Sequence, residues 1–528
     1  MAEAKLTVDG RPIAAEQGQP LLQAMLDSGL DIPHYCYHPK LTIDGSCRLC
    51  QVRIEGMPKL QIACNTPVRD GMIVHTEEPA VANARRGVLE LLLLNHPLDC
   101  PICDKAGECW LQNYSMRFGS RFSRSYLPRR KAGKRMDIGA RMLLDQERCV
   151  LCRRCVRFCR EITHSDELRI YNLGDRSVLD LDSRRLDNDY SICTADICPV
   201  GALESKDFHH KIRTWFLSET ASVCPHCANG CNITIGEYRN RIWRLLPRRN
   251  DNVNSTWMCD HGRLGYGFVA DPRRLRTPRV RAEGGLVEAN WDEALAITAQ
   301  ALSRLTTRHG GQALGAIISP HLTNEENFCF GRLLDALGVR SRAMAVRRGP
   351  ADDFLIKAEK AANARGVREL GLVAGGDDGL EALVAGLESG ALRGLYLCGD
   401  DFIDTPWAER LSPALAKLEV LIAHNLTARP ELADATVLWP ATTFAEKEGT
   451  FTNHAGHLQP ILRAIEPGPG WLDEGQIFTR LGAAITGVPA QFNLAETRRL
   501  MAREHPALAN HDAPMVAAAR GSNTPATQ

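Results

Sequence analysis

The sequence has no long hydrophobic run and almost no net charge. Its longest leucine run, Leu91 to Leu94, is far shorter than the roughly 20 apolar residues that a membrane-spanning helix needs. The N-terminal MAEAKLTVDG lacks a basic segment followed by an apolar core, so we expect neither a secretory signal nor direct membrane insertion. Because 64 basic residues face 63 acidic residues, the net charge of +1 gives no general reason to expect nucleic-acid or anionic membrane partners.

Cysteine is scarce in the second half of the chain. Of the 19 cysteines, Cys329 and Cys398 are the two that lie beyond residue 259. A reducing cytosol keeps thiols free, so the others predict metal ligation rather than a disulfide framework. The 528 residues also exceed what a single core usually holds, roughly 250 to 300 residues, so we expect several modules, with the metal chemistry in the first half.

The first group of cysteines follows a short β-rich opening. AKLTVDGRPIAAEQGQPLLQAMLDSGL predicts a strand, a DG turn, a second strand and a short helix, as in a small ferredoxin with a half-open sheet. The spacing C-x10-C-x2-C-x13-C then offers four thiolates that favour one [2Fe–2S] cluster. A structural zinc ion is the alternative, although zinc sites usually pair two C-x2-4-C knuckles and this group has one C-x2-C. The expected ligands are Cys36, Cys47, Cys50 and Cys64.

The second group, in NHPLDCPICDKAGEC, replaces one cysteine by a histidine at spacing H-x3-C-x2-C-x5-C. An isolated histidine before a proline is more often a surface or packing residue, but here three cysteines follow within one loop. Imidazole in place of thiolate removes a negative charge from a cluster, and the same exchange raises the potential of Rieske centres, so we expect a histidine-tuned [4Fe–4S] cluster. The preceding ANARRGVLELLLLNH has the spacing of a buried helix, whose end should begin the ligand loop. The expected ligands are His96, Cys100, Cys103 and Cys109.

The third group combines CVLCRRCVRFCRE with the later CTADICPVGAL. The first run has bacterial ferredoxin spacing, and in two-cluster ferredoxins the fourth cysteine of such a run serves the other cluster. Here only Cys193 remains nearby to join Cys159, so one [4Fe–4S] cluster is expected. Cys159 and Cys193 are interpreted as spare, the alternative being that they help an unrecognised second site. The expected ligands are Cys149, Cys152, Cys155 and Cys198.

The fourth group has the spacing C-x2-C-x3-C-x27-C, in VCPHCANGCNITI and STWMCDHGR. Between its members, ITIGEYRNRIWRLLPRRN alternates like a β-hairpin with an RN turn, which would return the last cysteine to the first three. Zinc is again the alternative, but this spacing is atypical of zinc fingers. The expected ligands are Cys224, Cys227, Cys231 and Cys259.

In this order the four groups resemble the large iron–sulfur subunit of bacterial NADH–quinone oxidoreductase, respiratory complex I. The phrases are IPHYCYHPKL, GSCRLCQV, ACNTPVRDGM, NHPLDCPICDKAGEC, CVLCRRCVRFCRE and DICPVGAL. The resemblance implies one [2Fe–2S] cluster on the first group and [4Fe–4S] clusters on the other three, the fourth lying off the main electron route. It also implies partners in the peripheral arm, namely the flavin- and NADH-binding subunit and quinone-side iron–sulfur subunits, at the cytoplasmic face of the inner membrane.

The second half predicts an α/β domain, because the apolar runs GALGAIISP, RGLYLCGDD, LEVLIAHN and DATVLWPA alternate with helical stretches such as DEALAITAQALSRL. DATVLWPATTFAEKEGTFTNHAGHLQP resembles a phrase that molybdopterin oxidoreductases carry near their pterin-nucleotide sites. In that phrase, however, His454, Ala455 and His457 stand where an acidic and a basic residue are common.

A molybdenum ligand is also missing from the expected place. Active relatives commonly carry a cysteine shortly after a helix like TNEENFCFGRLLDALG, but VRSRAMAVRRGPADDF has none, and Cys329 is interpreted as a small buried apolar residue within the helix. The C-terminal APMVAAARGSNTPATQ shows no further domain that would enclose a pterin. We therefore expect no molybdopterin.

We expect a multi-domain α+β chain that carries electrons from flavin toward quinone as part of an NADH:quinone oxidoreductase, with no catalytic residue or substrate site of its own. Neither G-x-G-x-x-G after a strand nor G-x-x-x-x-G-K-[ST] occurs, so nicotinamide and flavin chemistry should lie on another subunit. The expected domains are a [2Fe–2S] ferredoxin-like (β-grasp) domain at 1–80, a [4Fe–4S] domain with one histidine and three cysteine ligands at 81–120, a ferredoxin-type domain at 140–212, a molybdopterin-oxidoreductase-type [4Fe–4S] domain at 217–274, the α/β molybdopterin-oxidoreductase-like domain at 275–490 and a tail at 491–528.

Three other functions remain as alternatives. The molybdenum subunit of an NAD-dependent formate dehydrogenase would share all four groups, but the missing metal ligand argues against it. An iron-only hydrogenase would need a further cysteine-rich domain, and a zinc-knuckle interaction protein would be colourless rather than brown. The basic stretch Arg117 to Arg135 could dock acidic partners, although a solvated linker is favoured.

Overall fold

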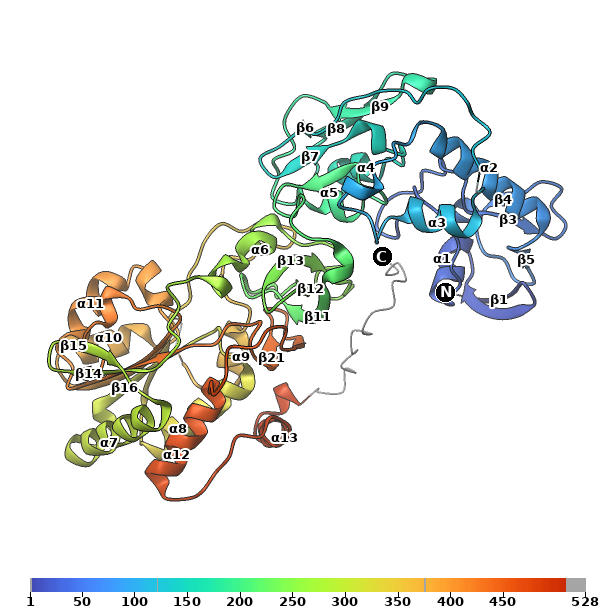
Figure 1. Cartoon of the computed structure of the whole chain (residues 1–528). Helices are drawn as coiled ribbons and strands as arrows, with labels where there is room; N and C mark the ends of the chain where they lie inside the picture. The colour runs from blue at the N-terminus through green and yellow to red at the C-terminus, as the bar shows by residue number, and fades with distance from the viewer. Residues whose placement is uncertain (1, 121, 375–376, 510–528) are drawn as a thin grey trace. The chain divides into compact units, whose positions relative to one another are not determined.

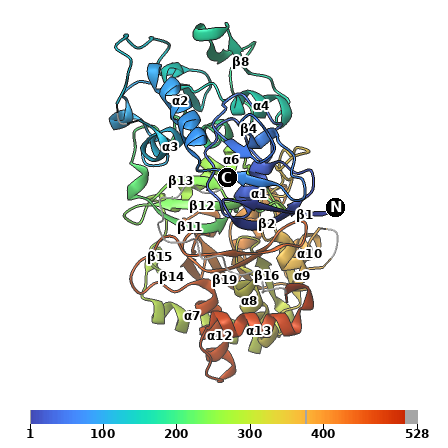
Figure 2. The ribbon, with the colours of Figure 1, turned by 90° about the vertical axis from the view of Figure 1, so that its right-hand side faces the viewer.

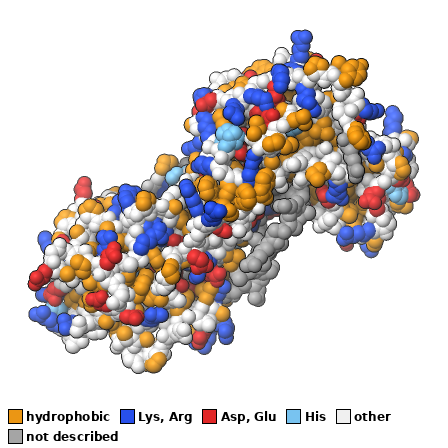
Figure 3. All heavy atoms as spheres, in the orientation of Figure 1, with side chains coloured by type: hydrophobic (Ala, Val, Ile, Leu, Met, Phe, Trp, Pro, Cys, Tyr) orange, Lys and Arg blue, Asp and Glu red, His pale blue; other side chains and the backbone are white. Residues whose placement is uncertain are grey.

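The computed structural model describes residues 2–120, 122–374 and 377–509, and the chain divides into two compact units, residues 1–217 and 218–520 (Figure 1). The first unit contains the first three ligand groups and the second unit contains the fourth. Basic and acidic side chains are interspersed over the visible face of each unit (Figure 3). Among the described residues, the structure has no helix both long and apolar enough to cross a bilayer.

The first unit opens with a five-stranded sheet in the order β2-β1-β5-β3-β4. Its elements are β1 (Glu3–Val8), β2 (Arg11–Glu16), α1 (Leu21–Asp27), β3 (Gln51–Ile54), β4 (Gln61–Ile62) and β5 (Ile73–His75). The DG turn joins β1 to β2 with Asp9 and Gly10 at φ values of 49° and 81°, in the left-handed region that tight hairpins use. Alternate residues of β1 are buried with the apolar side chains of α1, which confirms the predicted strand–turn–strand–helix opening.

The remainder of the first unit consists of short helices and small sheets around the second and third groups. Its elements are α2 (Pro79–Asn95), α3 (Trp110–Phe118), β6 (Met136–Asp137), β7 (Met142–Leu144), α4 (Arg154–Glu161), β8 (Leu168–Tyr171), β9 (Val178–Leu181), α5 (Cys193–Asp196) and β10 (Leu203–Ser205). Helix α2 ends at Asn95, so His96 begins the ligand loop as predicted. The prediction of a buried helix was wrong for its last turns: Leu91 is 69% exposed. Four consecutive leucines point around most of a helix circumference and cannot share one buried face.

The second unit begins with a three-stranded antiparallel sheet that carries the fourth group. Its elements are β11 (Ser218–Val223), β12 (Asn232–Glu237), β13 (Ile242–Pro247) and the short helix α6 (Asp260–Leu264). The hairpin between β12 and β13 turns at Arg239 and Asn240, whose φ values are 54° and 59°. This confirms the predicted RN turn.

The rest of the second unit is an α/β domain built on a seven-stranded sheet in the order β15-β14-β20-β19-β18-β16-β17. Its strands are β14 (Arg279–Ala282), β15 (Gly285–Glu288), β16 (Leu314–Ile318), β17 (Ser341–Met344), β18 (Gly394–Cys398), β19 (Val420–Asn425) and β20 (Val437–Pro440), with β21 (Gly449–Thr452) and β22 (Leu458–Ile461) as a separate pair. Its helices are α7 (Trp291–His309), α8 (Asn324–Ala336), α9 (Ala364–Glu369), α10 (Leu380–Glu388), α11 (Ala408–Leu415), α12 (Glu474–Thr486) and α13 (Leu494–Glu504). The five strands from β17 to β20 are parallel, and β14 joins β20 antiparallel, so the α/β prediction is confirmed.

Helices cover both faces of this sheet. One core contains side chains of α7, α8 and α12, while the other contains side chains of α10 and α11 (Figures 1 and 2). Alternate residues of β16 enter the two cores: Ala316 belongs to the first and Ile317 to the second. Helix α13 lies in the region expected as a tail and packs against α8, where Arg498 pairs with Glu325 at 2.6 Å. Residues 510–528, which include all of APMVAAARGSNTPATQ, lie outside the described part of the chain.

Candidate metal centres

The four cysteines of the first group form one continuous sulfur cluster. The Sγ atoms of Cys36 and Cys47 lie 3.5 Å apart, and Cys64 exchanges hydrogen bonds with both Cys36 and Cys50. Hydrogen bonds from Cys47 and Cys64 lower the pKa of Cys36, whereas those same contacts raise the pKa of the two donors. Such a group of thiols releases protons readily when a cation replaces the shared hydrogens.

The second group lies on the loop between α2 and α3. Cys100 begins a short 3-10 turn and is exposed, whereas Cys103 and Cys109 are buried. Burial, together with the charge of nearby Arg148, lowers the pKa of His96 to about 4. The imidazole is therefore neutral at physiological pH, the form in which histidine binds metals. Arg148 also interacts electrostatically with Cys103, which indicates that His96 and Cys103 are near the same cation.

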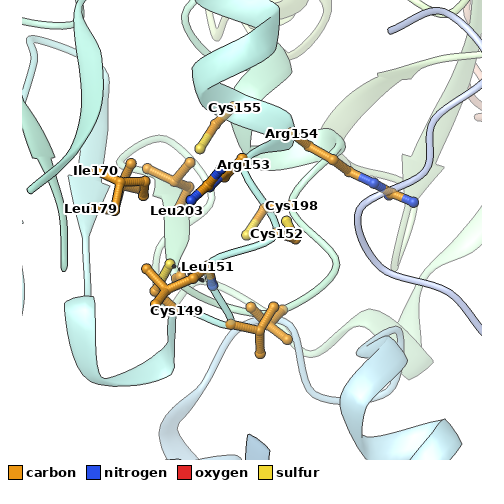
Figure 4. Close-up of a pocket in the computed structure, with 13 residues that line it drawn as sticks. Cys149, Leu151, Cys152, Arg153, Arg154, Cys155, Ile170, Leu179, Cys198 and Leu203 are labelled. Carbon is orange, nitrogen blue, oxygen red and sulfur yellow. Dashed lines mark hydrogen bonds between the residues drawn. The ribbon is translucent and has the colours of Figure 1, made fainter. Parts of the chain in front are cut away.

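The third group lines a cavity in the first unit (Figure 4). The lining includes Cys149, Cys152, Cys155 and Cys198, together with apolar side chains such as Ile170 and Leu179. Burial raises the pKa values of Cys149, Cys152 and Cys155, that of Cys152 to about 11, so ligation rather than free ionisation would stabilise their thiolates. The structure thus brings all four predicted ligands of this group together.

The loop that carries the third group has an unusual backbone. Leu151 and Arg153 separate its first three cysteines and have φ values of 53° and 60°, in the left-handed region that residues with a Cβ rarely adopt. Alternating right- and left-handed residues turn successive backbone N–H groups toward one concave side, which is how anionic clusters are bound in proteins. The N–H of Leu151 donates to Cys149 Sγ at 3.4 Å. This strained loop fits an anionic iron–sulfur cluster.

The fourth group is buried around α6. The backbone N–H of Gly262 donates to Cys259 Sγ at 3.3 Å, and Asn229 Nδ2 donates to Cys231 Sγ at 3.1 Å. A Cβ placed on Gly262 would lie 2.9 Å from Cys224 Sγ and 3.4 Å from Cys259 Sγ, so these two sulfurs flank the glycine. The hairpin has therefore returned Cys259 to Cys224, as the sequence predicts. N–H···S hydrogen bonds are typical of cluster ligands, and this site fits one.

Contacts between backbone segments connect the three groups of the first unit. The N–H of Trp110, next to Cys109, donates to the carbonyl of Pro199, next to Cys198, at 3.0 Å. A Cβ on Gly201 would lie 2.2 Å from Cys103 Sγ, so the second and third groups share a boundary. On the other side, α4 contacts the first group, because the Arg157 guanidinium donates to the Cys36 carbonyl. The third group thus adjoins both the first and the second.

Cys159 and Cys193 do not line the cavity of the third group. Both are fully buried, and the carbonyl of Cys159 caps the end of α4 by accepting from the N–H of Ser165 at 2.7 Å. Burial, with Glu167 nearby, raises the pKa of Cys159. Their surroundings favour the interpretation of spare cysteines.

The basic stretch after α3 is held by ion pairs within its own unit. Arg124 pairs with Glu90 at 2.6 Å, and Lys134 contacts Glu147 at 3.0 Å. Arg130 donates its backbone N–H to Asn95 at 3.0 Å. These contacts support the linker interpretation, since they attach the stretch to residues of its own unit.

Buried charges also occupy the α/β domain near its family phrase. Lys447 lies 2.9 Å from Glu326 and 3.8 Å from Glu474, and Arg274 pairs with Glu446 at 2.7 Å. These ion pairs join α8, α12 and the chain after β20, which gives them a structural role. Cys329 is partly exposed on α8 rather than fully buried as expected, because it lies at the margin of the helix interface.

Sequence reasoning did not single out the buried arginines of the ligand loops. Arg148, Arg154 and Arg157 are all buried, near the second, third and first groups respectively. A signal was present in CVLCRRCVRFCRE, where Arg154 and Arg157 are three apart and so share a helix face. Basic residues in such runs are usually exposed, and only the fold shows that these two are inside.

Family comparisons divide the chain in the order of the four ligand groups. Residues 2–79 match a 2Fe-2S iron-sulfur cluster binding domain and residues 85–124 the NADH-ubiquinone oxidoreductase-G iron-sulfur binding region. Residues 139–204 match the ferredoxin-like domain of NADH-quinone oxidoreductase subunit 3. Residues 217–271 match the molybdopterin oxidoreductase Fe4S4 domain, and residues 274–363 match molybdopterin oxidoreductase.

Individual relatives carry consistent names. The G subunit of NADH-quinone oxidoreductase from Rickettsia felis is 39% identical over 335 residues, which are 63% of this chain and 49% of the relative. The mitochondrial NADH-ubiquinone oxidoreductase 78 kDa subunit of Candida albicans is 40% identical over 59% of this chain and 43% of the relative. A chain of an NAD+-reducing [NiFe]-hydrogenase structure is 33% identical, with 40% of this chain and 92% of that chain covered and a TM-score of 0.36. The match spans about half the length of the curated relatives.

Proposed function

We propose that this chain, a homologue of the G subunit of NADH-quinone oxidoreductase, is an electron-transfer subunit of respiratory complex I that passes electrons from a flavin subunit toward quinone. The observation that carries the proposal is that the third ligand group of the first unit contacts both the first and the second group. Stepwise electron transfer requires centres that adjoin one another. It does not require a substrate site on the same chain.

The sixteen predicted ligands would hold one [2Fe–2S] and three [4Fe–4S] clusters. Clusters bound there would supply single-electron transfer at potentials that the protein sets. The chain itself keeps the cysteine sulfurs in contact, keeps His96 neutral and excludes water from most ligands. The matches to 2Fe-2S and 4Fe-4S binding domains support these cluster types.

Within the first unit, electrons would pass from the first group to the third and then to the second. The second group is suited to pass electrons to a partner, because Cys100 is exposed, as are the side chains of Leu98 and Ile102. Exposed apolar side chains beside an exposed ligand favour the docking of a partner subunit that carries the next iron–sulfur cluster. We propose that this partner is a quinone-side iron–sulfur subunit and that the flavin subunit docks near the first group.

The fourth group would lie off this route and serve as an accessory centre of the second unit. Its domain matches the Fe4S4 domain of molybdopterin oxidoreductases rather than a complex I domain. We propose that the α/β domain carries no molybdopterin and that the assembly works at the cytoplasmic face of the inner membrane. The formate dehydrogenase alternative is not favoured, because the named relatives are NADH-quinone oxidoreductase subunits.

Two variants in the assembled, membrane-derived complex test the proposal. Cys155→Ser removes a ligand of the third group, whereas Cys227→Ser makes the same change in the fourth. We expect Cys155→Ser to abolish NADH-driven quinone reduction and Cys227→Ser to keep most of it, with assembly checked by co-purification of the other subunits. Full activity of an assembled Cys155→Ser complex would contradict the proposed route, and loss of activity in an assembled Cys227→Ser complex would contradict the accessory role.

A further inference from the structure

We propose that Arg154 is a fixed counter-charge for the third ligand group, and that it raises the reduction potential of the cluster held there. The inference rests on the proposed function, because it concerns a cluster bound by Cys149, Cys152, Cys155 and Cys198. It assigns a distinct electrostatic task to a residue that is not a ligand.

Arg154 is one of the most deeply buried large side chains of the protein, with 1% of its surface exposed. It is the first residue of α4, between Cys152 and Cys155 in sequence, and it lines the cavity of the third group. Figure 4 shows its side chain extending from α4 toward a neighbouring segment of the chain, with Cys152 and Cys198 below it in this view. A permanently charged guanidinium is thus fixed beside the sulfur ligands.

The guanidinium contacts residues adjacent to ligands of all three groups in this unit. It donates to the carbonyl of Tyr37, next to Cys36, and to that of Ile197, next to Cys198, at 3.3 Å for the latter. Its Cζ also lies 4.5 Å from the ring centroid of Trp110, next to Cys109, in cation–π geometry. These three contacts hold the charge at the junction of the ligand loops.

No carboxylate among the described residues neutralises this charge. The hydrogen bonds of Arg154 go to carbonyl oxygens, and its Nε is buried without a partner. Two other buried arginines differ: Arg148 pairs with Glu204 at 2.5 Å, and Arg274 pairs with Glu446 at 2.7 Å. Carbonyl dipoles offset only part of the cost of burying a cation, so a negative group must supply the rest.

A thiolate-ligated iron–sulfur cluster is that negative group. The cluster becomes more negative by one charge when it is reduced, so a nearby cation stabilises the reduced form more than the oxidised form. The attraction between the guanidinium and the cluster is strong because both are buried, where the local dielectric constant is low.

Two other arginines of α4 provide comparisons, because they differ from Arg154 in burial and in the ligand group that they face. Arg157 is buried one turn later, donates to the Cys36 carbonyl and faces the first group. Arg160 lies on the same helix but is exposed, and it pairs with Asp166 at 3.2 Å. Loss of the Arg160 charge is expected to change little, because water screens exposed charges.

The test is a potentiometric EPR titration of the purified full-length protein with its clusters, for wild type, Arg154→Gln, Arg154→Lys and Arg160→Gln. We expect Arg154→Gln to lower the reduction equilibrium constant of the third cluster by about tenfold or more, which for a one-electron couple is about 59 mV. Arg154→Lys should lower it less, since charge is retained, and Arg160→Gln should leave it within about twofold of wild type. The fourth cluster, in the other unit, serves as an internal standard in every sample.

An Arg154→Gln protein whose third cluster keeps the wild-type potential would overturn the inference, as would an equal decrease in Arg160→Gln. A purely structural role predicts reduced cluster occupancy without a shift in potential, and the titration separates the two effects. If Arg154→Gln does not retain the third cluster, Arg154→Lys decides in its place. A third-cluster potential that is lower than in wild type and in Arg160→Gln would then support the counter-charge role, and a potential equal to that of wild type would contradict it.

Discussion

At the scale of single residues, the ligand loops depend on positions where no side chain fits. Gly201 and Gly262 have ordinary φ values, so backbone conformation does not explain them, but each lies against a cysteine sulfur of a neighbouring segment. The sequence marks neither glycine as special, since one follows a Cys-Pro pair and the other lies in a short helix. Only the folded chain shows that these glycines make room for the sulfur atoms.

Gly262→Ala is expected to weaken the fourth cluster. The added Cβ would lie 2.9 Å from Cys224 Sγ, closer than carbon and sulfur can approach, and an iron-bound sulfur cannot move away. Gly267→Ala is the matched control, because no heavy atom lies within 4 Å of its Cβ. Iron content and the EPR signal of the fourth cluster should fall severalfold in Gly262→Ala and stay unchanged in Gly267→Ala. Equal cluster retention in the two proteins would mean that this sulfur is not held in place.

His96→Cys is expected to keep a four-iron cluster at a lower potential, because thiolate adds a negative charge that imidazole lacks. His96→Ala should lose or convert the same cluster. A control is His164→Cys, which adds a thiol at an exposed position of the same unit. Redox titration followed by EPR measures all three variants. If His96→Ala leaves the spectrum and potential of every centre unchanged, the histidine is not a ligand.

At the scale of helices and strands, local signals predicted more than long-range packing. The DG and RN turns, the α8 helix from TNEEN and the parallel strands of the second unit follow from turn chemistry and hydrophobic spacing, and the structure confirms them. The exposure of Leu91 on α2 and the packing of α13 were not predictable in this way. Both depend on which neighbouring surface is available, and that information is not local in the sequence.

The core of the second unit should be sensitive to acid through His424 of β19. Its ring lies stacked between Tyr396 and Trp439, shares a hydrogen bond of 3.0 Å with the Tyr396 hydroxyl, and burial lowers its pKa to about 3. In the unfolded chain the imidazole of His424 becomes protonated near pH 6.5, whereas in the folded chain it stays neutral at that pH. Stability is therefore full above pH 6.5 and falls as the pH decreases toward 3, by about 2 kcal/mol at pH 5.

His424→Phe should remove this pH dependence while filling a similar volume. Chemical denaturation at pH 7.5 and pH 5, followed by circular dichroism, measures the difference for wild type, His424→Phe and the exposed-site control His457→Phe. The wild type and His457→Phe should lose stability at pH 5, and His424→Phe should lose about 2 kcal/mol less. The same acid loss in His424→Phe and wild type would show that another group controls the effect.

At the scale of the whole molecule, the chain combines a unit that carries three of the four ligand groups with a unit that carries the fourth group and an α/β domain, part of which matches molybdopterin oxidoreductase. The sixteen ligands could be predicted from sequence because most of them lie at short, regular spacings. The adjacency of the groups in space could not, because the contacts that join the third group to the other two connect residues far apart in the sequence, such as Arg157 and Cys36.

The second unit is expected to contain neither molybdenum nor tungsten. A pterin-bound metal needs a protein ligand or a substitute, and the stretch after α8 offers no cysteine. Elemental analysis and pterin fluorescence of the native protein check this expectation. Stoichiometric molybdenum with pterin, together with formate oxidation by this chain, would support the formate dehydrogenase alternative instead.

The most direct test of the central claim is a count of iron and acid-labile sulfide in the anaerobically purified full-length protein, combined with EPR of the reduced sample. One [2Fe–2S] and three [4Fe–4S] clusters predict about fourteen iron atoms per chain, little zinc, and four spectral components. Iron near eighteen atoms would mean that Cys159 and Cys193 join a further cluster. A colourless protein with stoichiometric zinc would contradict the account of an electron-transfer chain.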